Sequence, residues 1–440
     1  MTMTYKLLFF ESLGCPKNRV DAEVMISKLL NNGWEMTGDP HTADLIVLNT
    51  CSFISDAREE SISRFFELNS AKKKGAKIAL TGCLPQLYPD LKKSLKEADF
   101  ITGINDIGQI AKVVSDNWEN GYKPEIGKAE YIYSSFDQRA LTLSPFTAYL
   151  KIADGCDNCC SYCSIPAIRG KYRERSIEDI VSEAQNLVFS GVKELCIISQ
   201  DTTKYGIKSG TSLIELLSAL NSLPGSFKIR VMYLYPSGID SGFLKKVHDL
   251  KKVLPYFEIP VQHVSNPVLS DMNRHYTKDI VLKLINNIKN IFGDQYVLRT
   301  TFISSYPTEK KEDHELLKKF IEEGHFDYAG AFKYSKEEFT KSSKLRVIPK
   351  NIAQSRFEEI EKATHESMEK QLDRFVGMDM EILYEGIDPE LKVPVGRGWH
   401  QAPEIDGITI LTNIENQKPG NYYKCRLISR ECVDFIGELI

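Results

Sequence analysis

The sequence predicts a multidomain α/β protein whose chain ends in a small β-barrel. Three observations carry this prediction: strands alternate with helices up to about residue 110, six strand–helix units follow between residues 146 and 345, and short strands fill residues 376–440. Alternation predicts parallel sheets covered by helices. Short strands separated by Gly and Pro predict a small barrel. A chain of 440 residues also exceeds one ordinary core, so we expect two to four domains.

The composition is that of a globular protein without an overall preference for nucleic acid. Hydrophobic residues make up 42% and charged residues 26%, and the net charge of −4 gives no general attraction to nucleic acid or to an anionic membrane. No apolar run approaches the roughly 18 residues that cross a bilayer, and the N-terminus lacks the pattern of a signal peptide. Ten cysteines in such a chain predict a reducing compartment, the cytoplasm, and metal ligation rather than disulfides.

The N-terminal domain, residues 1–115, is expected to contain a parallel sheet. Strands are predicted at 5–12, 43–49 and 77–81, and helices at 21–31, 56–70 and 89–98.

Each of these strands is followed within three residues by a cysteine, namely Cys15, Cys51 or Cys83. Ligands bind outside the carboxyl ends of strands in open parallel sheets, so the three thiols are expected to converge. Gly14 and Gly82 would permit the close backbone approach that a bulky cluster requires. We therefore predict a three-cysteine iron–sulfur cluster at this edge of the sheet. The alternative is three unrelated buried cysteines.

A partial (β/α)6 barrel with a bridging helix is expected at 146–375, after a linker at 116–145. Its six strands are predicted at 147–153, 194–199, 228–234, 256–261, 296–303 and 328–332. The chemistry of such barrels belongs at the carboxyl ends of their strands. A long amphipathic stretch, 352–375, is predicted as the bridging helix.

The most informative motif lies directly after the first of these barrel strands. Cys156, Cys160 and Cys163 are spaced C-x3-C-x2-C. Three thiolates on one tight loop can hold three irons of a four-iron cluster and leave the fourth without a protein ligand. An iron with an open position can bind substrate or cofactor, so the motif predicts chemistry rather than electron storage. Zinc sites usually show a second C-x2-C pair or His ligands, and neither is nearby; Cys159 breaks the spacing and is interpreted as a bystander.

Polar residues follow two further barrel strands. Gln200 and Asp201 come after the second strand, and Gln262 and His263 after the fourth. A single histidine such as His263 is more often structural than catalytic. The basic run at 169–175 is expected either to contact a phosphate or carboxylate of the substrate, or to form a solvated loop before the next helix.

The last segment, 376–440, is expected to be a small acidic barrel. Its strands are predicted at 380–384, 392–395, 408–411 and 422–428. Eleven acids stand against six bases, which gives a net charge of −5. Such a barrel suits a basic protein better than the phosphates of a nucleic acid.

Together these features resemble the methylthiotransferases, radical S-adenosylmethionine (SAM) enzymes that carry two iron–sulfur clusters. Within that family they are most similar to the RimO type, which methylthiolates the β-carbon of an aspartate in the twelfth small-subunit ribosomal protein. The motifs that carry the resemblance are SLGCPKN at 12–18, QDTTKYG at 200–206 and APEIDG at 402–407. The resemblance covers nearly the whole chain, and it implies an N-terminal methylthiotransferase domain, a radical SAM core and a C-terminal, OB-like TRAM barrel.

The resemblance also implies the cofactors, which are SAM and two 4Fe–4S clusters. The ligands of the radical SAM cluster would be Cys156, Cys160 and Cys163, and those of the second cluster Cys15, Cys51 and Cys83. By analogy, one SAM methylates sulfur held at the second cluster, and another SAM gives the radical that activates the substrate carbon. The pocket for SAM or substrate is expected to contain Tyr162, Gln200, Asp201 and Gln262. An electron donor and a sulfur donor are further expected partners.

Three features depart from the family pattern. The loop at 304–310 (SSYPTEK) replaces a glycine-bearing stretch, Arg19 stands where an apolar residue is common, and Cys159 stands where a basic residue is common. None of these positions is one of the six proposed ligands. The departures therefore concern only how closely the backbone approaches SAM.

Two other functions share some of these features. A transfer-RNA methylthiotransferase would use the same chemistry but would need a basic groove for the anticodon stem, which the acidic barrel disfavours. A non-catalytic iron–sulfur or zinc protein would leave the six-unit barrel without a purpose. We therefore expect a cytoplasmic enzyme that binds the small-subunit ribosomal protein through its acidic C-terminal barrel.

Overall fold

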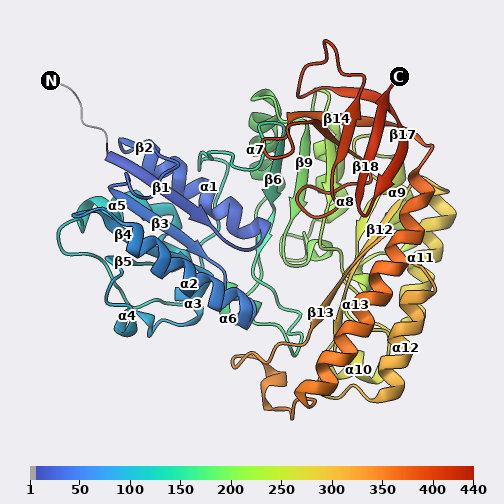
Figure 1. Cartoon of the computed structure of the whole chain (residues 1–440), viewed down its shortest axis with the longest axis horizontal. Helices are drawn as coiled ribbons and strands as arrows, with labels where there is room; N and C mark the ends of the chain where they lie inside the picture. Colours follow the sequence, from blue (N-terminus) through green and yellow to red (C-terminus); the bar gives the residue numbers. More distant parts are fainter. Residues whose placement is uncertain (1–5) are drawn as a thin grey trace. The chain divides into compact units, whose positions relative to one another are not determined.

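The computed structural model describes residues 6–440, which form two compact units (Figure 1). The first unit contains the chain up to Thr142 together with Lys151–Arg175 and Ser335–Ser343. The second unit contains Leu143–Leu150, Ser176–Tyr334 and Lys344–Ile440. Within the described residues, no helix combines the length and the apolar character needed to cross a membrane.

The first unit is built around a five-stranded parallel sheet, which confirms the predicted fold class. The strand order is β2-β1-β3-β4-β5, and all neighbours pair in parallel. The strands are β1 (Lys6–Ser12), β2 (Trp34–Met36), β3 (Leu45–Thr50), β4 (Lys77–Gly82) and β5 (Phe100–Ile101). The helices are α1 (Pro16–Leu30), α2 (Ser55–Ala71), α3 (Cys83–Leu87), α4 (Leu91–Ser94), η1 (Ile104–Gln109) and α5 (Ile110–Asp116). Tyr5, where the first strand was predicted to begin, lies outside the described residues.

Two predicted helices of this unit differ from the structure. Helix α1 begins at Pro16 rather than at residue 21, because proline suits the first helical turn. Its start escapes a search for apolar periodicity because polar residues such as Asn18 and Asp21 are buried. The helix predicted at 89–98 is wrong, since only Leu91–Ser94 is helical and the backbone leaves the helical region at Leu95.

The rest of the first unit surrounds the second cysteine motif. Strands β7 (Ala153–Asp154) and β8 (Arg173–Glu174) form an antiparallel pair. Between them the chain forms the loop that carries Cys156, Cys160 and Cys163, and then helix α6 (Ile165–Arg169).

The second unit contains the six strands of the predicted partial barrel. They are β6 (Thr147–Lys151), β9 (Glu194–Ile198), β10 (Lys228–Val231), β11 (Tyr256–Glu258), β12 (Val297–Ser304) and β13 (Tyr328–Lys333), in two sheets of order β10-β9-β6 and β11-β12-β13. A bridge between Ile229 and Val253 connects β10 to the segment that leads into β11. The helices are α7 (Ile177–Phe189), α8 (Leu213–Ser222), α9 (Ser241–Asp249), α10 (Asn266–Asp271), α11 (Lys278–Phe292) and α12 (Lys311–Glu322), with short turns η2 (Thr202–Lys204) and η3 (Pro236–Gly238). The turn η4 (Lys341–Lys344) begins in the Ser335–Ser343 stretch of the first unit.

Helix α13 (Lys350–Leu372) and the turn η5 (Asp373–Phe375) form the predicted bridge to the C-terminal barrel. That barrel is closed in the order β14-β15-β16-β18-β17. Its strands are β14 (Asp379–Ile387), β15 (Pro394–Gly398), β16 (Thr409–Thr412), β17 (Tyr422–Glu431) and β18 (Asp434–Leu439). The last strand was missed from the sequence because a glycine interrupts it, and a side chain at that position would meet Cys425.

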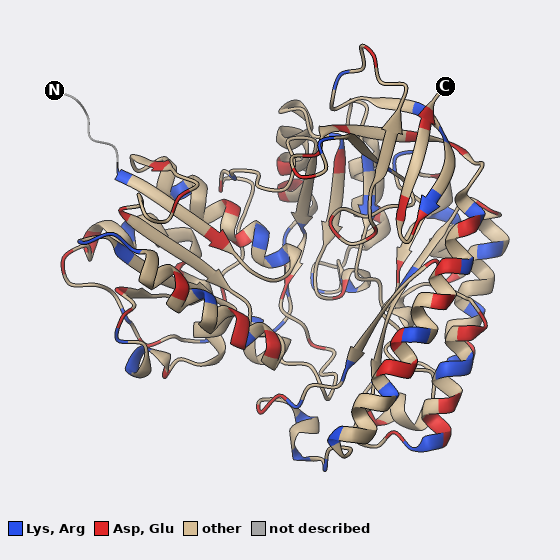
Figure 2. Cartoon of the chain, viewed as in Figure 1, with Lys and Arg blue, Asp and Glu red and all other residues tan. Residues whose placement is uncertain are grey.

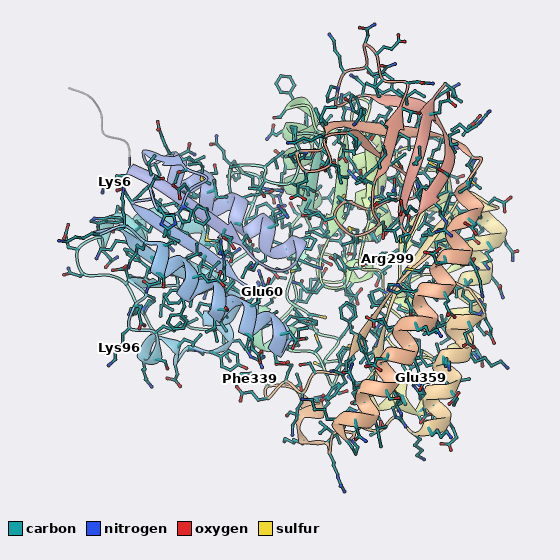
Figure 3. The ribbon with its side chains drawn as sticks, in the orientation of Figure 1. Lys6, Glu60, Lys96, Arg299, Phe339 and Glu359 are labelled. Carbon is teal, nitrogen blue, oxygen red and sulfur yellow. The ribbon has the colours of Figure 1, made fainter. Side chains whose placement is uncertain are left out.

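A buried carboxylate connects the C-terminal barrel to the partial barrel. Asp406 is fully buried and accepts hydrogen bonds from the Tyr256 hydroxyl (2.5 Å), Arg299 Nη1 (2.7 Å) and the backbone amide of Ala402 (2.9 Å). Arg299, labelled in Figure 3, belongs to β12. The hydrogen bonds of Asp406 therefore fix its own loop to strands β11 and β12 of the partial barrel.

Candidate iron–sulfur site

Three cysteines lie at the carboxyl edge of the parallel sheet, as predicted. Cys15 follows β1 and is the N-cap of α1, Cys51 follows β3, and Cys83 is the first residue of α3 after β4. Strands β1, β3 and β4 are neighbours in the sheet, so the three turns lie side by side. Cys15 is exposed, Cys51 is half-buried and Cys83 is buried.

The two predicted glycines allow these turns to pack closely. A Cβ atom at Gly14 (φ +91°) would lie 2.8 Å from Cβ and 2.9 Å from Sγ of Cys51. A Cβ atom at Gly82 (φ +93°) would lie 2.3 Å from Oδ1 of Asn49 and 2.8 Å from the carbonyl oxygen of Thr50. Only glycine fits both the left-handed backbone and these distances.

Asn18 contacts all three cysteine-bearing turns. Its Nδ2 donates to the carbonyl of Leu13, before Cys15, at 2.7 Å and to the carbonyl of Thr50, before Cys51, at 3.2 Å. Its Oδ1 lies 3.9 Å from Sγ of Cys83. Asn18 is 1% exposed, so one buried amide fixes the positions of the three turns.

A buried ion network lies directly behind Cys83. Arg169 donates to Sγ of Cys83 at 3.3 Å, and it pairs with Asp21 at 2.5 Å and with Asp154 at 3.2 Å. Lys151 pairs with the same two carboxylates at 2.5 and 3.2 Å. Every side chain of this network is at most 2% exposed.

Both interpretations of the basic run at 169–175 are therefore wrong for its buried arginines. Arg169 is 2% and Arg175 is 4% exposed. Arg175 lies over the ring of Tyr133 at 4.3 Å and donates to the carbonyl of Lys151 at 3.1 Å. These side chains are bound inside the first unit because their partners come from distant parts of the chain.

The three thiols are close enough to influence one another electrostatically. Burial raises the pKa of Cys83 to about 12; Arg169 opposes this shift, and Cys51 and Cys15 add to it. Burial also raises the pKa of Cys51, with a contribution from Cys15. Despite Arg169, the Cys83 thiol therefore stays protonated at neutral pH until a bound metal removes the proton outright.

Among residues 6–440, no three His, Cys, Asp or Glu side chains are placed to share one metal ion. The thiolates that hold a four-iron cluster lie farther apart than the ligands of a single ion. The donor set, three cysteines on adjacent turns with glycine at the closest approach, fits an iron–sulfur cluster with one open iron.

The second cysteine motif forms a tight loop in the same unit. The amide of Cys163 donates to the carbonyl of Cys160 at 3.1 Å, and the amide of Cys156 donates to that of Gly170 at 3.2 Å. Cys156, Cys160 and Cys163 are half-buried, whereas Cys159 is exposed and has a left-handed backbone (φ +53°). The loop therefore turns at Cys159, which is not a proposed ligand. This turn fits a loop that presents the other three cysteines as ligands.

The two cysteine groups lie on contacting segments. Ser164, next to Cys163, donates its hydroxyl to the carbonyl of Phe53, two residues after Cys51, at 3.1 Å. The contact of Arg169 with Cys83 is a second connection, because α6 directly follows the loop. All six predicted cluster ligands thus belong to the first unit.

The four residues predicted for the SAM or substrate pocket belong to different units. Tyr162 lies in the first unit, whereas Gln200, Asp201 and Gln262 lie in the second. Asp201 is buried and its carboxylate accepts from the hydroxyl of Thr203 at 2.5 Å. Gln200 and Asp201 follow the carboxyl end of β9, and Gln262 follows that of β11. The role of these three residues in a pocket stays a prediction.

Left-handed residues mark the carboxyl ends of three consecutive barrel strands. Tyr233 (φ +62°), Gln262 (φ +60°) and Ser305 (φ +63°) follow β10, β11 and β12. Such conformations cost energy in residues other than glycine and concentrate at functional sites. The sequence analysis singled out the loop that contains Ser305 but missed Tyr233. The signal for Ser305 was the lost glycine of the loop at 304–310, since the backbone keeps a conformation that glycine would favour.

His263 has the environment of a structural histidine. It is fully buried, its Nδ1 accepts from the amide of Ser265 at 3.0 Å, and its Nε2 lies 3.5 Å from Glu309. Glu309 also pairs with Arg356 of α13 at 3.0 Å. The histidine thus binds within its own segment, and Glu309, through the Ser305 amide and Arg356, fixes the loop after β12.

The exposed charges of the C-terminal barrel keep its acidic surplus. Figure 2 colours its acidic and basic residues along the ribbon. Seven of its acids are exposed, namely Asp379, Glu381, Glu390, Glu404, Glu415, Glu431 and Glu438. Four of its bases are exposed, namely Lys392, Lys418, Lys424 and Arg426. Asp406 and Arg397 are in buried ion pairs, with Arg299 and with Glu194 respectively.

Three family models match successive parts of the chain. Residues 7–103 match the uncharacterized protein family UPF0004, residues 150–321 match the radical SAM superfamily, and residues 376–440 match the TRAM domain.

Curated relatives match almost the whole chain. A protein of Aquifex aeolicus named ribosomal protein uS12 methylthiotransferase RimO is 39% identical over 431 residues, which cover 97% of this chain and 95% of that protein. Proteins with the same name from Geobacter sulfurreducens and Thermotoga maritima are 37% and 40% identical, over 98% and 97% of this chain and 97% and 98% of their own lengths.

Solved structures share the fold at low sequence identity. The radical SAM methyltransferase TsrM from Kitasatospora setae, with cobalamin and a [4Fe-4S] cluster bound, superposes with a TM-score of 0.55 and 13% identity over 77% of each chain. The cobalamin-dependent SAM radical enzyme OxsB gives a TM-score of 0.51 at 15% identity, over 82% of this chain and 56% of that one. These similarities concern the fold alone.

Proposed function

Since this chain belongs to the RimO family of ribosomal protein uS12 methylthiotransferases, we propose that it adds a methylthio group to the β-carbon of an aspartate in uS12. The observation that carries the proposal is the grouping of six cysteines, in two sets of three, within one compact unit. We assign a radical SAM cluster to Cys156, Cys160 and Cys163, and a second 4Fe–4S cluster to Cys15, Cys51 and Cys83.

The chemistry of the substrate explains why two clusters are needed. A β-hydrogen of aspartate is a poor acid, and the neighbouring carboxylate makes its removal as a proton harder still. The bound cofactors supply a radical route to this carbon and a place to hold sulfur, and they carry the difficult chemistry. The chain itself contributes ligands, close packing of the turns at Gly14 and Gly82, and exclusion of water from buried Cys83.

We further propose that Tyr162, Gln200, Asp201 and Gln262 line the pocket for SAM or substrate. Support comes from their positions, which are the cysteine loop and the carboxyl ends of β9 and β11, where barrels of this type place their chemistry. Replacing Gln200 or Asp201 by alanine should slow the production of deoxyadenosine. Unchanged rates would remove them from the site.

The acidic C-terminal barrel is proposed to bind uS12. Its exposed charges are seven acids and four bases, which favours a basic protein and disfavours a phosphate backbone. We place this reaction in the cytoplasm, with a low-potential electron donor and a sulfur donor as further partners.

The test is a competition between two substrates. The protein, reconstituted with iron and sulfide without oxygen, would receive SAM, a low-potential reductant, uS12 and transfer RNA, and mass spectrometry would locate the added group. A methylthio group on a uS12 aspartate is the expected result. Modified transfer RNA would keep the radical chemistry but would overturn the assignment of the substrate.

Three cysteine variants separate the roles of the two clusters. Cys160→Ala should abolish deoxyadenosine and the product together, whereas Cys83→Ala should abolish only the product. Cys159→Ala is the matched control from the same loop and should keep both activities. Loss of activity in Cys159→Ala, or product from Cys83→Ala, would contradict the proposed ligand sets.

A further inference from the structure

We propose that Arg169 is a positioning residue that tunes the electron affinity of the second cluster through its hydrogen bond to Cys83. The inference rests on the proposed function, because it requires a cluster at Cys15, Cys51 and Cys83. It goes beyond that function by assigning a role to a side chain that is not itself a ligand.

The geometry places the guanidinium against the sulfur. Arg169 Nη2 lies 3.3 Å from Sγ of Cys83 and 3.2 Å from Oδ1 of Asn18. Asn18 is the residue that contacts all three cysteine-bearing turns. Both contacts are made by Nη2, while Nη1 faces Asp21 and Asp154, so the planar fork holds two sets of partners at once, which a lysine ammonium cannot do with the same geometry.

The opposite side of the guanidinium is fixed by acids. Nη1 of Arg169 pairs with Asp21 and Asp154. Lys151 shares both carboxylates, so the two acids and the two cations balance in charge. The network without Cys83 is therefore neutral, and a thiolate at Cys83 would receive a hydrogen bond from a rigid, permanently charged donor.

This arrangement has a direct consequence for electron transfer. Reduction adds negative charge to an iron–sulfur cluster, and hydrogen bonds to its sulfurs together with nearby positive charge stabilise the reduced state. Burial strengthens the effect, because Arg169 is only 2% exposed and water screens it little. Arg169 should thus raise the reduction potential of the second cluster.

The same residue belongs to the segment that carries the radical SAM cysteines. Arg169 ends helix α6, which begins two residues after Cys163. Asp154 directly precedes Gly155 and Cys156, and its carboxylate accepts from the amide of Gly155 at 2.9 Å. One arginine therefore fixes a ligand of the second cluster relative to both ends of the radical SAM loop.

The test isolates the second cluster. In a background with Cys156, Cys160 and Cys163 all replaced by alanine, the full chain is reconstituted and titrated with reductant while electron paramagnetic resonance follows the cluster. Arg169→Gln should lower the ratio of reduced to oxidised cluster at least tenfold at a fixed ambient potential, which is about 59 mV for a one-electron couple. Arg169→Lys keeps the charge without the fork and should give a smaller decrease, of at least about threefold.

Asp21→Asn is the matched control, because it removes an ion pair from the same network and leaves the contact with Cys83. It removes a negative charge, so it should leave the ratio unchanged or increase it. A ratio within threefold of the background in a folded Arg169→Gln protein would overturn the inference. If that variant does not fold, an unchanged ratio in Arg169→Lys would overturn it instead.

Iron analysis distinguishes the two possible failures. If the background protein binds no iron, the second cluster itself is refuted, and the role of Arg169 is refuted with it. If the background protein binds a cluster whose potential does not respond to Arg169, only the tuning role is refuted. A decrease in Asp21→Asn equal to that in Arg169→Gln would also refute it, because the effect would then come from disrupted packing.

Discussion

Replacement of Asn18 by alanine should loosen the whole cysteine edge of the first unit. The change leaves the carbonyls of Leu13 and Thr50 without the amide donor that lies at 2.7 and 3.2 Å, and it removes an acceptor from Arg169 at 3.2 Å. Two neutral hydrogen bonds contribute about 1 kcal/mol each and a charged one about 1.5 kcal/mol or more. Arg169 keeps its two carboxylates, so we expect a total loss of about 3 kcal/mol.

Hydrogen exchange of the iron-free protein measures this loss locally, because a multidomain chain does not unfold in one step. The amides of β3 (Leu45–Thr50) should exchange about 100-fold faster in Asn18→Ala, since each 1.4 kcal/mol is tenfold. Asn32→Ala is the control, because Asn32 is exposed just after α1 and its side-chain amide donates to the nearby carbonyl of Lys28. A change below tenfold in Asn18→Ala, or an equal change in Asn32→Ala, would refute the role of this amide. The variant should also retain less iron at Cys15, Cys51 and Cys83 after reconstitution.

Three further perturbations test other parts of the structure. Gly14→Ala should bind less iron, because its Cβ would lie 2.8 Å from Cβ of Cys51. Gly75→Ala is the control, because Gly75 also has a left-handed backbone (φ +86°) but no atom lies within 4 Å of the added Cβ. The control should lose only about 1 kcal/mol of stability and no iron. Asp406→Ala should destabilise the second unit by about 3–5 kcal/mol in thermal unfolding, because a buried arginine loses its carboxylate, and an unchanged transition would contradict this. Burial lowers the pKa of His400 from 6.5 to about 3. Between pH 6.5 and about pH 3, only the unfolded chain protonates His400. The free energy of unfolding should therefore fall by about 2 kcal/mol between pH 7 and about pH 5, as measured by denaturant titration. His400→Phe should abolish this pH dependence.

The cysteine edge could be predicted because it depends on local patterns and one general rule. Apolar runs indicated β1, β3 and β4, and parallel strands place their carboxyl ends at the same edge. Their cysteines then had to be neighbours, and the sheet order confirmed it. The closed C-terminal barrel was predicted in the same way from its short strands.

The surroundings of the cysteines could not be predicted, because they depend on partners far apart in the sequence. The basic run at 169–175 looks solvated when its letters are considered alone. In the structure Arg169 pairs with Asp21, which lies 148 residues earlier in the chain. No local periodicity reports such a pair. The domain boundaries at 115, 145 and 375 and the composition of the SAM pocket remain predictions.

The first unit is assembled from three separate stretches of the chain, and this has a consequence for its biosynthesis. The last stretch, Ser335–Ser343, pairs Glu337 with Arg58 and packs Phe339, labelled in Figure 3, on Tyr88 with ring centroids 5.3 Å apart. Within the same stretch the amide of Ser342 donates to the carbonyl of Ser161 in the cysteine loop at 2.8 Å. The N-terminal sheet therefore leaves the ribosome early. The loop with Cys156, Cys160 and Cys163 is covered only after Ser343 has been synthesised. Iron loaded during translation would meet an open site, and the unit is closed only when most of the chain has been made.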